Sequence, residues 1–238
     1  GKVYEYYKAT FGRRSYDGKD SRMVSVVHMG KQFNNAFWTS EYKLMAYGDG
    51  DGSMLIDTTL GLDVAAHEMT HAVTSSSANL VYAKEPGALN ESFSDVFGKL
   101  VAFENDGNWY IGDKIVGPGL GRKAIRNMKN PEEFKQPGSN DSKYRVPTPK
   151  TGPCLDRDHC GVHRNSGIPN RAAVLIVESI GKEKAEHLYY NVLTKRLSAM
   201  SGFSEMRKET EKECALRFGG ASSTECRAVR KAFDTVKM

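Results

Sequence analysis

The chain has 238 residues, of which 39% are hydrophobic and 26% charged, and its formal net charge is +5. This composition is typical of a globular protein with a sizeable core, and no apolar run approaches the roughly 18 residues that a membrane-spanning helix needs. Lys and Arg are interleaved with Asp and Glu instead of forming a block, which argues against a nucleic-acid partner.

The first sixty residues carry strand and turn signals in "RMVSVVHMG", "NNAFWTSEYKLMAYG" and "YGDGDGS", and they predict a β-rich N-terminal lobe. We interpret "YGDGDGS" as a turn because it lacks the full ligand set of a twelve-residue calcium loop. The first residues, "GKVYEYYKAT", have neither an initiator Met nor an apolar signal core, so a mature or excised fragment is expected.

Helical patterns dominate the rest of the chain and predict a mostly helical second lobe. The segment 105–168 has weaker periodicity and holds most of the prolines, which is typical of a functional or mobile region. The expected division is a lobe of residues 1–76, ending in the first helix, and a lobe of residues 77–238. The expected helices cover 62–76, 87–104, 169–180, 182–199, 203–218 and 222–236.

Four cysteines fall into two local pairs, Cys154 with Cys160 and Cys214 with Cys226. Neither pair has the spacing of a zinc ribbon. We expect two disulfides, and therefore an oxidising, extracellular compartment, with free thiols as the alternative.

The stretch "DVAAHEMTHAVTS" places His67 and His71 four residues apart around Glu68. On a helix these histidines stand one above the other, and both imidazoles can reach one ion. Glu68 points about 100° away from His67, which suits a general base better than a ligand. The alternative is an exposed helix face, but the small apolar flanks indicate partial burial, where polar groups need partners.

A catalytic zinc needs a third protein ligand and keeps its fourth position for water. The downstream stretch "NESFSD" supplies Glu91 and, one turn later, Asp95 on the same face. We expect Glu91 to be the ligand and Asp95 to orient a histidine through a hydrogen bond, with Asn90 as a second candidate for that role.

These motifs resemble those of the thermolysin-like zinc metalloendopeptidases. Glu91 follows His71 by twenty residues, and further matches run in order through "NNAFW", "YGDGDG", "NLVY", "RNMKNP" and "GVHRNSGIPNRAA". The resemblance covers essentially the whole chain. It implies an α+β, two-lobed fold, with a β-rich N-terminal lobe, a mainly helical C-terminal lobe and the active-site helix between them.

The resemblance also implies a secreted endopeptidase that hydrolyses peptide bonds with a zinc-activated water. Tyr82 and His163 match the oxyanion donors, and Asp158 matches the carboxylate that holds that histidine. The substrate-binding positions are Asn35 and Ala36 on an edge strand, Arg126 for a substrate carbonyl, and Leu55, Val64 and Ile125 for a bulky apolar side chain after the cleaved bond.

Two features depart from the family pattern. The chain is shorter at its N-terminus, so the sheet is expected to have fewer strands and an exposed edge. Calcium is expected to bind weakly or not at all, because Asp63 and Asp113 match carboxylate ligands whereas Ala102, Asn108 and Tyr110 fall where further acidic ligands are usual.

A competing hypothesis is a catalytically weak, zinc-stabilised binding or structural module on the same fold. Retention of Glu68 argues against it, since a purely structural site has no need for a base. An exopeptidase is a third alternative, but no acidic cluster for a free substrate N-terminus is evident. The expected cofactor is one catalytic zinc, the expected partners are protein or peptide substrates and an inhibitory propeptide, and a monomer is expected.

Overall fold

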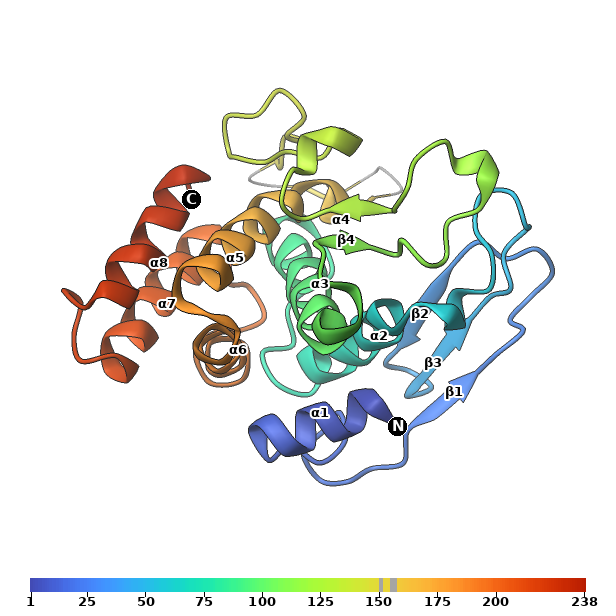
Figure 1. The fold of residues 1–238 in the computed structure, drawn as a ribbon, viewed down its shortest axis with the longest axis horizontal. Coiled ribbons are helices and arrows are strands. Elements are labelled where there is room, and N and C mark those ends of the chain that lie inside the picture. The colour runs from blue at the N-terminus through green and yellow to red at the C-terminus, as the bar shows by residue number, and fades with distance from the viewer. Residues whose placement is uncertain (150–151, 155–157) are drawn as a thin grey trace. The chain divides into compact units, whose positions relative to one another are not determined.

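The computed structural model describes residues 1–149, 152–154 and 158–238 (Figure 1). The chain forms two compact units. The first comprises residues 1–76 and 94–126, and the second comprises residues 77–93 and 127–238. The long helix α3 (Lys84–Asp106) contributes its first part to the second unit and the rest to the first. The division expected between residues 76 and 77 stays a prediction.

The first unit contains a small mixed sheet. Its strands are β1 (Val24–Val26), β2 (Ala36–Thr39) and β3 (Leu44–Tyr47). β3 lies in the middle, parallel to β1 and antiparallel to β2, with Ala36 opposite Tyr47 (Figure 1). Within the described part of the chain β2 pairs only with β3, so its outer edge matches the predicted edge strand.

An N-terminal helix, α1 (Lys2–Phe11), lies where only strand and turn signals were expected. Val3 and Tyr7, one turn apart, form its buried face, and Gly12 ends it in the left-handed conformation, which glycine adopts without steric cost. The Tyr7 ring packs 5.7 Å from that of Phe97 on α3, and its hydroxyl lies 2.7 Å from Thr70 Oγ1 on α2 (Leu62–Ser75). α1 therefore covers the helices that carry the site.

Helices α2 and α3 approach closely within the first unit. A Cβ at Gly98 would lie 2.8 Å from the Asp63 carbonyl oxygen, so only glycine allows this approach. This unit also contains two 3₁₀ helices, Thr58–Leu60 and Pro118–Leu120. A two-stranded sheet consists of β4 (Tyr110–Ile111) and β5 (Arg126–Asn127).

The second unit is helical. Its main helices are α5 (Gly167–Ile180), α6 (Lys182–Asn191), α7 (Phe203–Arg217) and α8 (Thr224–Thr235). Both α5 and α7 pack on α6 and α8. The helix expected over 182–199 is α-helical only to Asn191, continues as a π-helical segment (Val192–Arg196), and becomes extended at Leu197. Two short elements precede α5, a 3₁₀ helix (Pro131–Phe134) and α4 (Val162–Asn165).

Both expected disulfides are confirmed. One joins Cys154 to Cys160, and the other joins Cys214 on α7 to Cys226 on α8. Among the helices described, none has the length and apolarity required to cross a membrane.

Candidate metal centre and active site

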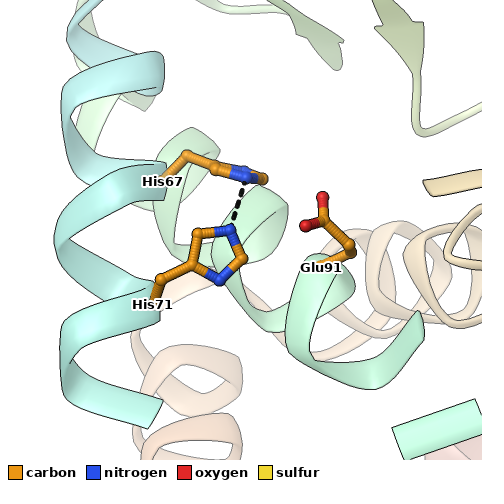
Figure 2. Close-up of side chains that lie close together, drawn as sticks. All are labelled: His67, His71 and Glu91. Carbon is orange, nitrogen blue, oxygen red and sulfur yellow. Dashed lines mark hydrogen bonds between the residues drawn. The ribbon is translucent and has the colours of Figure 1, made fainter. Parts of the chain in front are cut away.

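The two histidines of the sequence motif lie one turn apart on α2. Their Nε2 atoms are 3.0 Å apart, and their rings are nearly perpendicular (Figure 2). His67 donates its Nδ1–H to Asp95 Oδ1 at 2.8 Å, and His71 Nδ1 lies 3.1 Å from Ser94 Oγ. With both Nδ1 atoms engaged by α3, both Nε2 atoms are available as ligands.

Glu91 precedes Asp95 by one turn on the continuous helix α3, and its side chain is 1% exposed. His67, His71 and Glu91 each offer a ligand atom within 4.8 Å of the others, as Figure 2 shows. Two ligands at zinc–nitrogen distances of about 2.0–2.1 Å from a tetrahedral ion lie about 3.4 Å apart. The separation of the Nε2 atoms and the two-imidazole, one-carboxylate donor set therefore fit zinc.

Asp95 is the centre of a buried polar network. Arg126 donates from Nε to Oδ2 at 2.8 Å and from its terminal nitrogen to Oδ1 at 2.6 Å. Burial alone would raise the pKa of Asp95, but the charge of Arg126 and the hydrogen bond from His67 outweigh it and lower the pKa to about 2. Asp95 is therefore ionised and can hold the His67 tautomer. This contact of Arg126 with Asp95 was not predicted, because the family resemblance implied only a contact between Arg126 and a substrate carbonyl.

Glu68 follows His67 on α2 and is 6% exposed. The hydroxyl of Tyr47 on β3 has a pKa raised by burial and by the negative charge of Glu68. Glu68 is thus close enough to Tyr47, the last residue of β3, for its charge to act there. It is absent from the group of potential metal ligands found among the described residues.

Tyr82 and His163 meet around Glu91 within the second unit. The Tyr82 hydroxyl donates to Glu91 Oε1 and lies 3.1 Å from His163 Nε2, which is 3.4 Å from the same carboxylate oxygen. Gly87 permits this approach, since a Cβ there would lie 2.5 Å from Val162 Cγ1. The three side chains form one cluster although 81 residues separate Tyr82 from His163.

Asp158 holds His163 through both side chain and backbone. Its Oδ1 accepts from His163 Nδ1 at 2.6 Å and from the His163 amide at 3.1 Å. Burial raises the pKa of Asp158, but these hydrogen bonds outweigh it and leave the pKa below its ordinary value. A carboxylate so placed orients the ring so that Nε2 faces the Tyr82 hydroxyl.

The other predicted site residues occupy defined places. Asn90 donates its side-chain amide to the Leu80 carbonyl at 3.2 Å, so it braces the segment before α3. Asn35 and Ala36 lie at the start of β2, where the Asn35 carbonyl accepts from the Gly48 amide at 3.0 Å.

The three predicted specificity residues all belong to the first unit. Val64 is buried on α2, Leu55 forms a bridge with Val116, and the Ile125 amide donates to the Ile111 carbonyl at 2.9 Å. The sequence did not single out Ile115, which is buried beside two of these residues. The side chains of Ile115 and Val64 both lie close to Gly61, and those of Ile115 and Ile125 both lie close to Gly112.

The region expected to have lost calcium contains a lysine that the sequence analysis did not identify. Lys99 on α3 is fully buried and donates to Asn108 Oδ1 at 3.3 Å, and Asn108 donates to Asp113 Oδ2 at 3.3 Å. Asp63 accepts from the Gly112 amide at 2.7 Å. Burial raises the pKa of Asp63, and the charge of Lys99 partly opposes that rise. An ammonium group among these oxygens does not suit a calcium ligand set.

Comparisons with known proteins agree with this geometry. The thermolysin metallopeptidase catalytic-domain model matches residues 1–75, and the model of the alpha-helical domain matches residues 78–238. Neutral protease NprE of Bacillus pumilus is 42% identical over 236 residues, which cover 99% of this chain and 73% of that protein.

Longer relatives are covered less completely. Bacillolysin of Bacillus subtilis strain 168 is 42% identical and thermolysin of Alicyclobacillus acidocaldarius is 40% identical. The chain spans 42% and 43% of their lengths. A solved structure described as the precursor of protealysin, a metalloproteinase from Serratia proteamaculans, superimposes with a TM-score of 0.87 at 33% identity, over 99% of this chain and 75% of that one.

Proposed function

Because the chain belongs to the thermolysin metallopeptidase family, whose members are zinc-dependent hydrolases, we propose that it is a secreted zinc endopeptidase acting on proteins or peptides. The observation that carries the proposal is the paired Nε2 atoms of His67 and His71, 3.0 Å apart and each backed by a group on α3. A structural zinc site is usually closed by four protein ligands, whereas three ligands leave a position for water.

His67, His71 and Glu91 would hold the ion. When bound, zinc acts as a Lewis acid that polarises the scissile carbonyl and acidifies water. Asp95 and Ser94 keep the histidine rings oriented, and Arg126 keeps Asp95 ionised. Such partners of metal ligands typically change affinity or activity by about 10–100-fold when mutated.

Glu68 is proposed as the general base. It is buried on the same helix as the histidines, one residue from His67, and is not part of the ligand group. Its carboxylate would accept the proton of the attacking water and deliver it to the leaving amine. This role needs a group that takes up a proton and then releases it, and a neutral amide is too weak a base to do so.

Tyr82 and His163 are proposed to donate hydrogen bonds to the negative charge that develops on the carbonyl oxygen. Each such donor is typically worth about 10²–10³ in kcat. Asp158 holds His163 in the orientation that this requires. The Tyr82 hydroxyl, which donates to Glu91 in this structure, is the donor that must turn toward substrate.

Substrate binding is proposed along the outer edge of β2 at Asn35 and Ala36, where an extended peptide can add as a strand. Leu55, Val64 and Ile125 would favour a bulky apolar side chain after the cleaved bond. Arg126, which donates two hydrogen bonds to Asp95, would also contact a substrate carbonyl. Calcium is proposed to bind weakly, and an inhibitory propeptide is proposed as a natural partner.

The test is casein digestion by the purified protein with and without a chelator, together with zinc analysis. Glu68→Gln should retain about one zinc per chain and lose hydrolysis by several orders of magnitude. Glu178→Gln, which removes a carboxylate exposed on α5, is the matched control and should retain activity. Full zinc occupancy without chelator-sensitive hydrolysis would favour the competing hypothesis of a binding or structural module.

A further inference from the structure

The turn before His163 contains three consecutive residues in the left-handed region. The φ angles are 47° at His159, 65° at Cys160 and 84° at Gly161. Glycine accepts this conformation readily, whereas His and Cys adopt it only where the surrounding structure holds them. The turn therefore requires an external constraint.

Two contacts constrain the strained pair. The disulfide ties Cys160, which is 4% exposed, to Cys154 across six residues. The His159 carbonyl accepts from the Lys84 amide at 2.9 Å. Both constraints act on the left-handed residues themselves, so neither can be lost without weakening the conformation of the turn.

The turn fixes the direction of the Asp158 carboxylate. The amides of Gly161 and Val162 both donate to the Asp158 carbonyl at 2.8 Å, which folds the chain back so that its side chain meets the amide and ring of His163. An extended conformation at Cys160 would break these two backbone hydrogen bonds, and the chain would no longer fold back toward His163. Asp158 and His163 are thus paired only while the turn keeps its shape.

The same turn also contacts Tyr82. The His159 ring packs edge-on against the Tyr82 ring, with centroids 5.8 Å apart, and the Tyr82 hydroxyl lies 3.1 Å from His163 Nε2. One constrained segment therefore positions both groups to which we assign oxyanion stabilisation. The second disulfide, Cys214–Cys226, joins α7 to α8 and makes no link to this turn.

We propose that the Cys154–Cys160 disulfide is a positioning element of the active site, holding the left-handed turn that orients His163 and Tyr82. The proposal rests on the proposed peptidase function and adds to it a pair of residues with no chemical part in hydrolysis. Its loss should weaken transition-state stabilisation while leaving zinc and substrate binding in place.

The experiment compares Cys154→Ser/Cys160→Ser with Cys214→Ser/Cys226→Ser, using a peptide substrate well below the melting temperature of each variant. Serine variants are preferred to a reducing agent because thiols bind zinc. The first variant is expected to lose at least about tenfold in kcat, against the 10²–10³ of a whole donor. Its KM should stay within about threefold of the wild-type value, and its zinc content within about 20%. The control should retain kcat.

A double-mutant cycle with His163→Ala identifies the route of the effect. If the disulfide acts through His163, the combined variant loses less than the product of the separate losses. Losses that multiply, or an unchanged kcat in Cys154→Ser/Cys160→Ser, would overturn the proposal. If that variant does not fold, His159→Ala keeps the disulfide and should still lower kcat several-fold through Tyr82, and an unchanged kcat there also overturns it. An inactive wild-type protein with full zinc would count against the proposed function instead.

Discussion

Replacing Lys99 with Met removes the positive charge of a fully buried side chain and nearly preserves the volume of that side chain. Lys99 donates to Asn108 and its charge favours the ionised form of Asp63, which is 1% exposed. Without it, Asp63 stays in a low-dielectric site with only hydrogen bonds to balance its charge. The variant should therefore be markedly less stable than wild type.

The magnitude follows from the remaining contacts. Removing the partner of a buried polar group typically costs about 1–3 kcal/mol, and more where a charge is involved. Asp63 keeps hydrogen bonds from the Val64 amide at 2.9 Å and the Gly112 amide at 2.7 Å, which argues for about 3 kcal/mol. For a chain of this size that loss lowers Tm by about 6–12 °C.

The assay is a thermal melt in a Glu68→Gln background, so that autolysis does not distort the transition. Lys208→Met removes an exposed charge on α7 and should change the free energy of unfolding by no more than about 0.5 kcal/mol. The pKa of Asp63 is already raised in the folded protein. Losing Lys99 raises it further, so the Lys99→Met deficit should be larger at pH 8 than at pH 5. A Tm within 2 °C of wild type at pH 8 would refute this reasoning.

Three further outcomes are expected. Millimolar calcium should raise the wild-type Tm by no more than a few degrees, because an ammonium already occupies the region of Asp63, and a rise of ten degrees or more in melts at constant zinc would contradict this. Asp95→Asn should weaken zinc binding about 10–100-fold in a competition titration, because His67 loses its charged partner, whereas unchanged affinity would count against that contact. Glu213 has a pKa lowered, against burial, by hydrogen bonds from Arg196 and Asn191, so Glu213→Gln should cost on the order of 1–3 kcal/mol near pH 7. That cost should disappear as the pH falls below the ordinary glutamate pKa, and a pH-independent difference in Tm would show that ionisation is not responsible.

Local patterns predicted the helix that carries the metal motif almost to the residue. The expected range 62–76 compares with Leu62–Ser75, because small apolar residues around the motif favour a helix buried on several faces. α1 was not predicted because Val, Tyr and Phe also favour strands. Its Tyr7 stabilises a helix only through Phe97 and Thr70, which are distant in sequence.

The partners of the site residues were predictable only in part. Asp95 lies one turn after Glu91, so helical geometry suggested that it orients a histidine, and the structure shows that this histidine is His67. Ser94 stands in the same "NESFSD" cluster, but nothing local distinguishes a serine that faces His71 from one that faces the core. Tyr82 and His163 are brought together only by tertiary structure, so the residues alone gave no reason to pair them and the family resemblance did.

The sequence of helix α3 could have predicted more of the buried contacts of its charged residues. Glu91, Asp95 and Lys99 are spaced by four and form one stripe, a pattern that usually indicates a solvated face. Yet the rest of this stretch is small or apolar apart from Asn90, and each residue from 86 to 100 is buried. A helix with no solvated face must give each charged residue an internal counterpart. Glu91 lies in the candidate metal centre, Asp95 accepts from Arg126, and Lys99 donates to Asn108 and acts electrostatically on Asp63. Charged residues at helical spacing within a buried helix therefore predict buried partners, and the counterpart of Lys99 had to be sought among the acidic residues in the first turn of α2 and after α3.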